Sequence, residues 1–244
     1  MKVLNYFNVR TFLAIVVSQF AAFLAFHYDL KLSHNLILFG IIVAFPLHFS
    51  LQSAFKRREK ALEYFSQFKA GLMAVHYSFQ VSQNLSDELK TEGRNLLKGI
   101  VDTVIAQLEA RKGEYAAVQM RLNDLLAFSY KYREEVSKRN VLRMIRYLKD
   151  VTESSTFLIS MVRHRTMTGI RFYATLFILL FPFVQAPIVI HYFSNDLPTW
   201  AIYAACAMGA LALITLDNFQ KMLEYPFDPR GMDNIQLRDF SLDI

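Results

Sequence analysis

Three bulky apolar residues recur at four-residue spacing near the start of the chain, at Ile37, Ile41 and Phe45. Residues four apart lie on one face of a helix, so these side chains would form a single stripe. In a symmetric ring of chains, such stripes stack as apolar collars around an axis, which conduct ions when wide and block them by dewetting when narrow. The alternative is an ordinary lipid-facing or helix-packing stripe, and the spacing alone does not separate the two.

Polar and basic residues follow this stripe. A polar side chain within an apolar helix faces protein or water rather than lipid, so His48 is either a pore-lining residue or a helix contact. Pro46 permits a kink in the same helix. Lys56, Arg57 and Arg58 either anchor the helix among lipid headgroups or form a positive ring that concentrates anions at a cytoplasmic vestibule.

No pattern of residues in the sequence is typical of an enzyme. The chain lacks a phosphate-binding glycine loop, a His-Glu-x-x-His pair and a Gly-x-Ser-x-Gly turn, and its 6 His residues are scattered. The single Cys206 leaves no partner for an intrachain disulfide and gives no thiolate metal site. We therefore expect no catalytic residue, no metal and no cofactor. The net charge of +6 comes from basic residues that alternate with acidic ones, which argues against nucleic-acid binding.

Four apolar stretches must position these residues, two near each end of the chain. They cover residues 11–28, 32–55, 172–195 and 197–216. Each is close to the roughly 20 apolar residues that cross a bilayer as a helix, in which the backbone satisfies its own hydrogen bonds. The first could instead be a signal peptide, but no small-residue cleavage pattern follows Phe26 and a second apolar stretch comes at once. Four transmembrane helices in two hairpins are the favoured interpretation.

The segment between the two hairpins is basic, with 21 Lys and Arg against 13 Asp and Glu between residues 55 and 171. The short loop around Asp29 holds one Lys, and the loop around Asp196 holds neither Lys nor Arg. By the positive-inside rule, both termini and the middle segment are cytoplasmic. We expect a multi-pass protein of a plasma or inner membrane.

The middle segment has the apolar periodicity of helices and no strand alternation. The apolar stripes cover residues 61–79, 97–108, 115–126 and 141–157. Ser86 is expected to cap the second of these helices and Gly113 to end or weaken it. No Pro lies between Pro46 and Pro182, and stripes of this length bury best as a helical bundle below the membrane.

The sequence thus predicts an all-α protein with four transmembrane helices and an inserted cytoplasmic helical bundle. The expected domains are transmembrane helices 1 and 2 (residues 1–55), the cytoplasmic helical region (56–165), transmembrane helices 3 and 4 (166–218) and a cytoplasmic C-terminal tail (219–244).

The tail reads Glu224-Tyr225-Pro226-Phe227-Asp228, followed by Asp233 and by Ile235-Gln236-Leu237. This is similar to the acidic-x-Pro-Phe-Gly segment, then Asp and Leu-x-Leu, that closes the membrane domain of bestrophins. Phe181-Pro182-Phe183 resembles the family's Leu-Pro-Phe, and Trp200 follows at a similar remove. Residues 54–61 resemble the Tyr-Asp-Arg-x-x-Glu-Ala segment after the second span. The order of two spans, a helical insert and two spans also matches, so the resemblance covers nearly the whole chain.

The resemblance implies a homopentamer whose central pore conducts mainly small anions such as chloride or bicarbonate. The second span would line this pore and an apolar neck would narrow it. Gly40 matches the glycine before a neck aromatic, which puts Ile41 at the collar and Ile37 one turn earlier, whereas a shift of one residue substitutes Ile42 and Leu38. Calcium-gated members carry a run of carboxylates after Pro-Phe-Gly, and since this chain has only Asp228 and Asp233 there, we do not expect calcium gating.

The favoured function is therefore a bestrophin-like ion channel, not an enzyme, whose partners are membrane lipid, small anions and further copies of the chain. The second hypothesis is a membrane scaffold or signalling adaptor whose cytoplasmic helical bundle binds a partner protein. It predicts a monomer or dimer and no ion flux, so oligomer mass and current separate the two.

Overall fold

The computed structural model describes residues 8–34, 36–111, 113–164, 168–227 and 235–242. These residues form eight α-helices and a short 3-10 helix, with no strand among them. The chain divides into two compact units, which we describe separately. Unit 1 takes in the described residues of Met1–Lys56 and Thr166–Glu224. Unit 2 takes in those of Arg57–Arg165, Tyr225–Arg230 and Asn234–Ile244.

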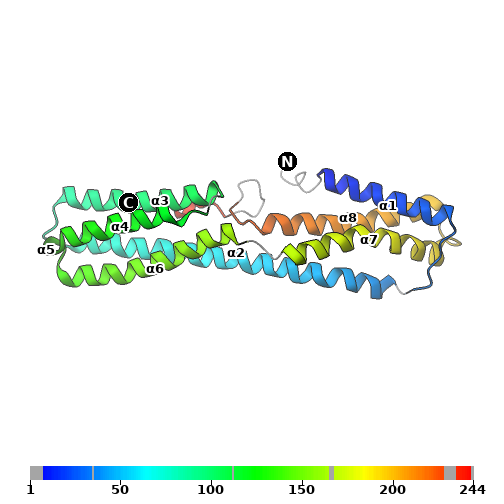
Figure 1. Cartoon of the computed structure of the whole chain (residues 1–244), viewed down its shortest axis with the longest axis horizontal. Coiled ribbons are helices and arrows are strands. Elements are labelled where there is room, and N and C mark those ends of the chain that lie inside the picture. Colours follow the sequence, from blue (N-terminus) through cyan, green and yellow to red (C-terminus); the bar gives the residue numbers. More distant parts are fainter. Residues whose placement is uncertain (1–7, 35, 112, 165–167, 228–234, 243–244) are drawn as a thin grey trace. The chain divides into compact units, whose positions relative to one another are not determined.

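Unit 1 is built from α1 (Val9–His27), the first part of α2 (Leu36–Val81), α7 (Thr168–Phe193) and α8 (Thr199–Leu223). Helices α1, α7 and α8 each pack against the other two (Figure 1). Within the described residues, three helices are long and apolar enough to cross a membrane. They are Val9–His27, Phe172–Phe193 and Thr199–Leu223. The predicted span at residues 32–55 is helical from Leu36 onward, and that it crosses the membrane stays a prediction.

Small side chains lie where the helices of unit 1 meet. Ala22 and Ala25 of α1 are almost fully buried in one cluster with Ala186 of α7 and Cys206 of α8. Without bulky side chains between them, helix backbones in a membrane approach closely and gain van der Waals contact. Cys206 is buried within this cluster and packs against its apolar side chains.

Unit 2 is a bundle of the second part of α2 with α3 (Asp87–Glu109), α4 (Tyr115–Lys131), α5 (Arg133–Val136) and α6 (Lys138–Arg163). Its core contains most of the largest fully buried side chains among the described residues. They include Phe65, Phe68, Leu72 and Phe79 of α2, Leu97, Ile100 and Leu108 of α3, Leu125 of α4 and Met144 of α6. Helices α3, α4 and α6 contact one another along this core (Figure 1).

The predicted N-terminal cap of the second helix of unit 2 is confirmed. The Ser86 side chain accepts a hydrogen bond from the Leu89 backbone N–H, 3.4 Å away, and so caps α3. Helix α3 ends at Glu109 with Ala110 as its C-cap, four residues before Gly113, which has φ +64 and lies between α3 and α4. The Ser86 cap satisfies a backbone N–H group that the helix would otherwise leave unpaired.

Three details of the predicted helices are wrong. Leu126 and Ile145, members of the third and fourth stripes, are exposed. Each follows a buried residue of its own helix, Leu125 or Met144, and the next position lies about 100° further around the helix, outside the buried face. Helix α8 also continues past the predicted end at residue 216, because the polar residues after it are buried and paired instead of facing solvent.

Candidate functional site

The first part of α2 has two faces of different exposure. Val43 and Leu47 are buried, and they share a cluster with Ala174, Ile178 and Phe181 of α7. The opposite face carries the stripe predicted from the sequence, with exposed fractions of 71% for Ile37, 55% for Ile41 and 59% for Phe45. Helix α2 thus packs on one side within unit 1 and presents a bulky apolar stripe on the other.

Aromatic rings extend this exposed stripe by one further turn. The rings of Phe45 and Phe49 meet edge to face with their centres 4.6 Å apart. His48 is exposed beside them, with its ring 6.0 Å from that of Phe49. Among the residues that the structure describes, His48 therefore makes no buried helix contact, and its role in a pore stays a prediction.

Gly40 leaves open space next to the stripe. A Cβ atom added to Gly40 would meet no atom within 4 Å. Neither a close helix contact nor an unusual backbone conformation within one chain therefore requires glycine at this position. The space would be occupied by whatever faces this side of α2.

An apolar surface of this kind needs a partner that is not water, because large exposed apolar patches are rare on monomers in water. Helix α1 also exposes bulky side chains, including Phe12, Phe20 and Phe23. Such surfaces would be kept from bulk water by lipid, by a second copy of the chain or by a position in a narrow pore. Exposure alone thus does not assign the α2 stripe to a pore, and the neck positions stay predictions.

The three basic residues after the predicted second span differ in their surroundings. Lys56, in unit 1, is exposed. Arg57, in unit 2, is half-buried, and its guanidinium donates a hydrogen bond to the backbone carbonyl of Met161 in α6. Arg58 is also half-buried. Arg57 therefore has a structural role in fastening α2 to α6, while the predicted positive ring remains untested.

The two Pro-Phe pairs of the family resemblance occupy different environments. In α7, Pro182 is buried and Phe183 is partly exposed on another face of the helix. In the tail, Pro226 is buried, its carbonyl accepts a hydrogen bond of 2.8 Å from the backbone N–H of Ile235, and Phe227 is only 2% exposed. The tail pair is therefore part of the core of unit 2. Asp233, the last residue predicted from the family motif, lies outside the described residues.

A polar cluster at one end of unit 1 was missed from the sequence. Asn218 of α8 donates a hydrogen bond of 3.1 Å to the Thr11 hydroxyl of α1, and it accepts one of 3.5 Å from the Asn8 side chain. Next to it, Lys221 forms an ion pair with Asp217, whose side chain is buried. The spacing of four between Asp217 and Lys221 is a readable signal, since such pairs lie on one helix face. The link to α1 has no counterpart in the sequence.

The described residues contain no group of three His, Cys, Asp or Glu side chains that could hold a metal ion. His76 in unit 2 is buried, and this burial, reinforced by the charge of nearby Arg94, lowers its pKa below the usual value. His76 belongs to the helical bundle and not to the exposed stripe of α2.

Comparison with known proteins places the fold. No family model matches the chain, and no curated protein does. Among solved structures, a bacterial bestrophin homolog from Klebsiella pneumoniae has a TM-score of 0.76 at 14% identity, covering 95% of this chain and 93% of that chain. A variant of that homolog reaches a TM-score of 0.82 at 11% identity with the same coverage. A structure described as a membrane protein gives 0.78 at 11% identity, covering 96% of this chain and 95% of that chain.

These likenesses extend over almost the whole chain, so both units take part in them. Together with the three helices that are long and apolar enough to cross a membrane, they identify a membrane protein. The chain is an all-α membrane protein with the fold of the bacterial bestrophin homologs.

Proposed function

We propose that this protein is an ion channel that passes small anions, such as chloride or bicarbonate, through the central pore of a homopentamer. The observation that carries the proposal is the bestrophin fold over 95% of the chain. The first part of α2 lines the pore, and the apolar stripe at Ile37, Ile41 and Phe45 forms its neck. The protein is a multi-pass protein of a plasma or inner membrane, with both termini and unit 2 on the cytoplasmic side.

The exposed stripe of α2 supports this assignment of the neck. Its side chains are bulky, uncharged and turned away from the rest of unit 1. Collars of such residues resist the passage of ions when narrow, because water leaves an apolar constriction. Lys56 and His48, both exposed, would supply polar and positive surface on one side of the neck.

The direct test is a current measurement on the purified full chain in a planar bilayer under a salt gradient. A current that reverses near the chloride equilibrium potential supports an anion channel. Reversal near the cation potential overturns the proposed selectivity. The absence of current, with a monomer or dimer mass in detergent, overturns the channel and favours the scaffold hypothesis.

The neck is tested with matched variants on two helices. Ile41→Ala removes an exposed aliphatic side chain from the proposed neck and should change single-channel conductance or rectification. Val16→Ala removes one from the exposed surface of α1 and should leave the current unchanged. If Ile42→Ala changes the current and Ile41→Ala does not, the neck is shifted by one residue.

A further inference from the structure

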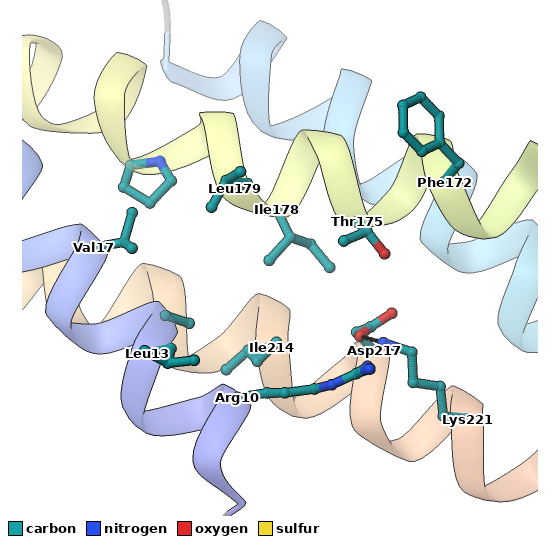
Figure 2. Close-up of a pocket in the computed structure, with 12 residues that line it drawn as sticks. Arg10, Leu13, Val17, Phe172, Thr175, Ile178, Leu179, Ile214, Asp217 and Lys221 are labelled. Atoms are coloured by element: carbon teal, nitrogen blue, oxygen red, sulfur yellow. Dashed lines mark hydrogen bonds and ion pairs between the residues drawn. The ribbon is translucent and has the colours of Figure 1, made fainter.

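A cavity of about 600 Å³ lies within unit 1, between α1, α7 and α8. Most of its wall is apolar. Leu13 and Val17 of α1 face Ile178 and Leu179 of α7, and Ile214 of α8 completes this part of the wall (Figure 2). All three helices that line the cavity are long and apolar enough to cross a membrane. The cavity therefore belongs to the part of the protein that lies in lipid.

One end of the cavity carries charge. Arg10 of α1, with Asp217 and Lys221 of α8, lies at this end, and the Arg10 side chain extends toward the other two (Figure 2). Asp217 is only 3% exposed and is already neutralised by its ion pair with Lys221. The guanidinium of Arg10 makes no ion pair with any residue in the described part of the chain. The charged end of the cavity thus has one positive charge in excess.

We propose that this cavity binds an anionic phospholipid, with one acyl chain along the apolar wall and the phosphate at Arg10 and Lys221. The two parts of the cavity fit the two parts of an amphiphile. The apolar walls accommodate a hydrocarbon chain, and a guanidinium binds phosphate oxygens. The headgroup is anionic because Arg10 supplies a positive charge that no carboxylate of the cavity offsets. Basic pockets between transmembrane helices are recognition sites for such headgroups.

The position of the charged groups also fits the lipid. Arg10 lies in the first turn of α1, and Lys221 lies in the last turn of α8. Phosphate groups of a bilayer lie at the ends of spanning helices, while the acyl chains run along their middle. A lipid whose phosphate contacts Arg10 would therefore place its chain beside Val17 and Ile178. The bound lipid would tie α1 to α7 and α8.

The experiment is native mass spectrometry of the full chain with defined lipids. Phosphatidylglycerol should bind about tenfold more tightly than phosphatidylcholine, a difference that one charge-assisted contact can produce. Arg10→Gln should abolish that preference, whereas Lys31→Gln, which removes a positive charge beyond the other end of α1, should preserve it. Val17→Trp fills the cavity and should reduce binding of both lipids, whereas Val16→Trp, on the exposed side of α1, should not.

Equal binding of the two lipids by the unchanged chain, or an unchanged preference in Arg10→Gln, would overturn the proposal. Inorganic phosphate and a free fatty acid separate the sources of the anion. Binding of phosphate alone at the same site, or of fatty acid in preference to phosphatidylglycerol, would replace the lipid by that ligand. The readout requires no ion current, so its result is independent of the channel proposal.

A second measurement uses only the unchanged protein, so it tests the proposal even if the variants fail to fold. A photoactivatable phosphatidylglycerol with the reactive group on its acyl chain is bound to the unchanged protein and crosslinked. The label, located to single residues, should be found on Leu13, Val17, Ile178 or Leu179. Labelling that is spread evenly over α1, α7 and α8, or confined to the exposed Val16 side of α1, contradicts a cavity-bound chain.

Discussion

The Tyr225 hydroxyl donates a hydrogen bond to the backbone carbonyl of Leu108, in the last turn of α3. The same carbonyl also accepts a hydrogen bond of 3.2 Å from the backbone N–H of Arg111, so the Tyr225 hydroxyl is its second donor. The Arg111 guanidinium also lies 4.2 Å from the centre of the Tyr225 ring. The tail after α8 is therefore fastened to unit 2 by polar and aromatic contacts together.

The tail contacts predict that unit 2 depends on Tyr225. Removing its hydroxyl in Tyr225→Phe should lower the free energy of unfolding by about 0.5–1.5 kcal/mol, the usual net contribution of one hydrogen bond, because the Leu108 carbonyl keeps its bond to Arg111. Chemical denaturation of the full chain in detergent, followed by circular dichroism, measures the change. Tyr130→Phe is the control, because Tyr130 is exposed on α4 of the same unit. Equal stability of the two variants would contradict an anchoring role.

The buried ring of Phe227 predicts a larger loss of stability than the Tyr225 hydroxyl does. Its ring is 5.8 Å from that of Phe65 and meets it edge to face, within the core of unit 2. Phe227→Ala should cost about 3–5 kcal/mol, because it removes a buried ring and leaves a cavity. The same denaturation experiment gives the value. Phe183→Ala, in the Pro-Phe pair of α7, removes a partly exposed ring and should cost clearly less.

How far the sequence predicts the fold depends on the distance between contacting residues. The helices of unit 2 and the N-terminal cap of α3 are local features, and the spacing of apolar residues together with Ser86 predicts them. The contact of Phe227 with Phe65 joins segments far apart in the chain. The sequence of neither segment indicates that the other is its partner. The Pro-Phe pair is recognised by resemblance, but its role as a core residue of unit 2 comes only from the structure.

The polar end of unit 1 was missed for a related reason. An apolar run is predicted to end at its first charged residue, so the last predicted span stops before Asp217. In the structure, this carboxylate is paired with Lys221 and buried, and Asn218 reaches Thr11 of α1. A polar residue that finds its partner on another helix remains inside the packed region. Hydrophobic periodicity detects apolar faces only, so it does not predict hydrogen bonds between polar residues of different helices.

Gly71 marks a close approach between α2 and α6. An added Cβ would lie 2.6 Å from the Val151 side chain, whereas carbon atoms in contact are about 3.5–4.0 Å apart. Gly71→Ala should destabilise unit 2 by about 1–3 kcal/mol through overpacking, and Val151→Ala in the same chain should recover part of the loss. Gly99→Ala is the control, because its Cβ meets no atom within 4 Å. Its gain in helix propensity should leave stability unchanged or raised by up to about 1 kcal/mol.

His76 predicts a pH dependence of unit 2. Burial, and then the charge of Arg94, lowers its pKa below the unfolded value of 6.5, so the folded state favours neutral imidazole. Above that value neither state binds the proton. As the pH falls below 6.5 and toward the folded pKa, the unfolded state binds it first and stability is lost.

The thermal midpoint of the full chain should therefore fall more steeply between about pH 7.5 and about pH 5 in the unchanged protein than in His76→Gln. Exposed His164 provides the control substitution, His164→Gln, which should keep the steep fall. Parallel curves for the unchanged chain and His76→Gln would show that His76 contributes nothing to the acid sensitivity.

A substitution at Gly40 distinguishes an effect on the stability of α2 from an effect on ion conduction. Because a Cβ at this position meets nothing within one chain, Gly40→Ala should keep or raise stability, by up to about 1 kcal/mol. If Gly40 lies beside Ile41 in the neck of a pore, as the channel proposal has it, the added methyl group narrows the pore. Single-channel conductance should then fall while the thermal midpoint does not.

Gly169→Ala is the matched control for this experiment, since its Cβ also meets no atom within 4 Å and it lies in α7 of the same unit. It should leave both conductance and stability unchanged. A Gly40→Ala channel that conducts like the unchanged protein places this side of α2 away from the narrowest part of the pore. The exposed stripe of Ile37, Ile41 and Phe45 would then face lipid or another copy of the chain.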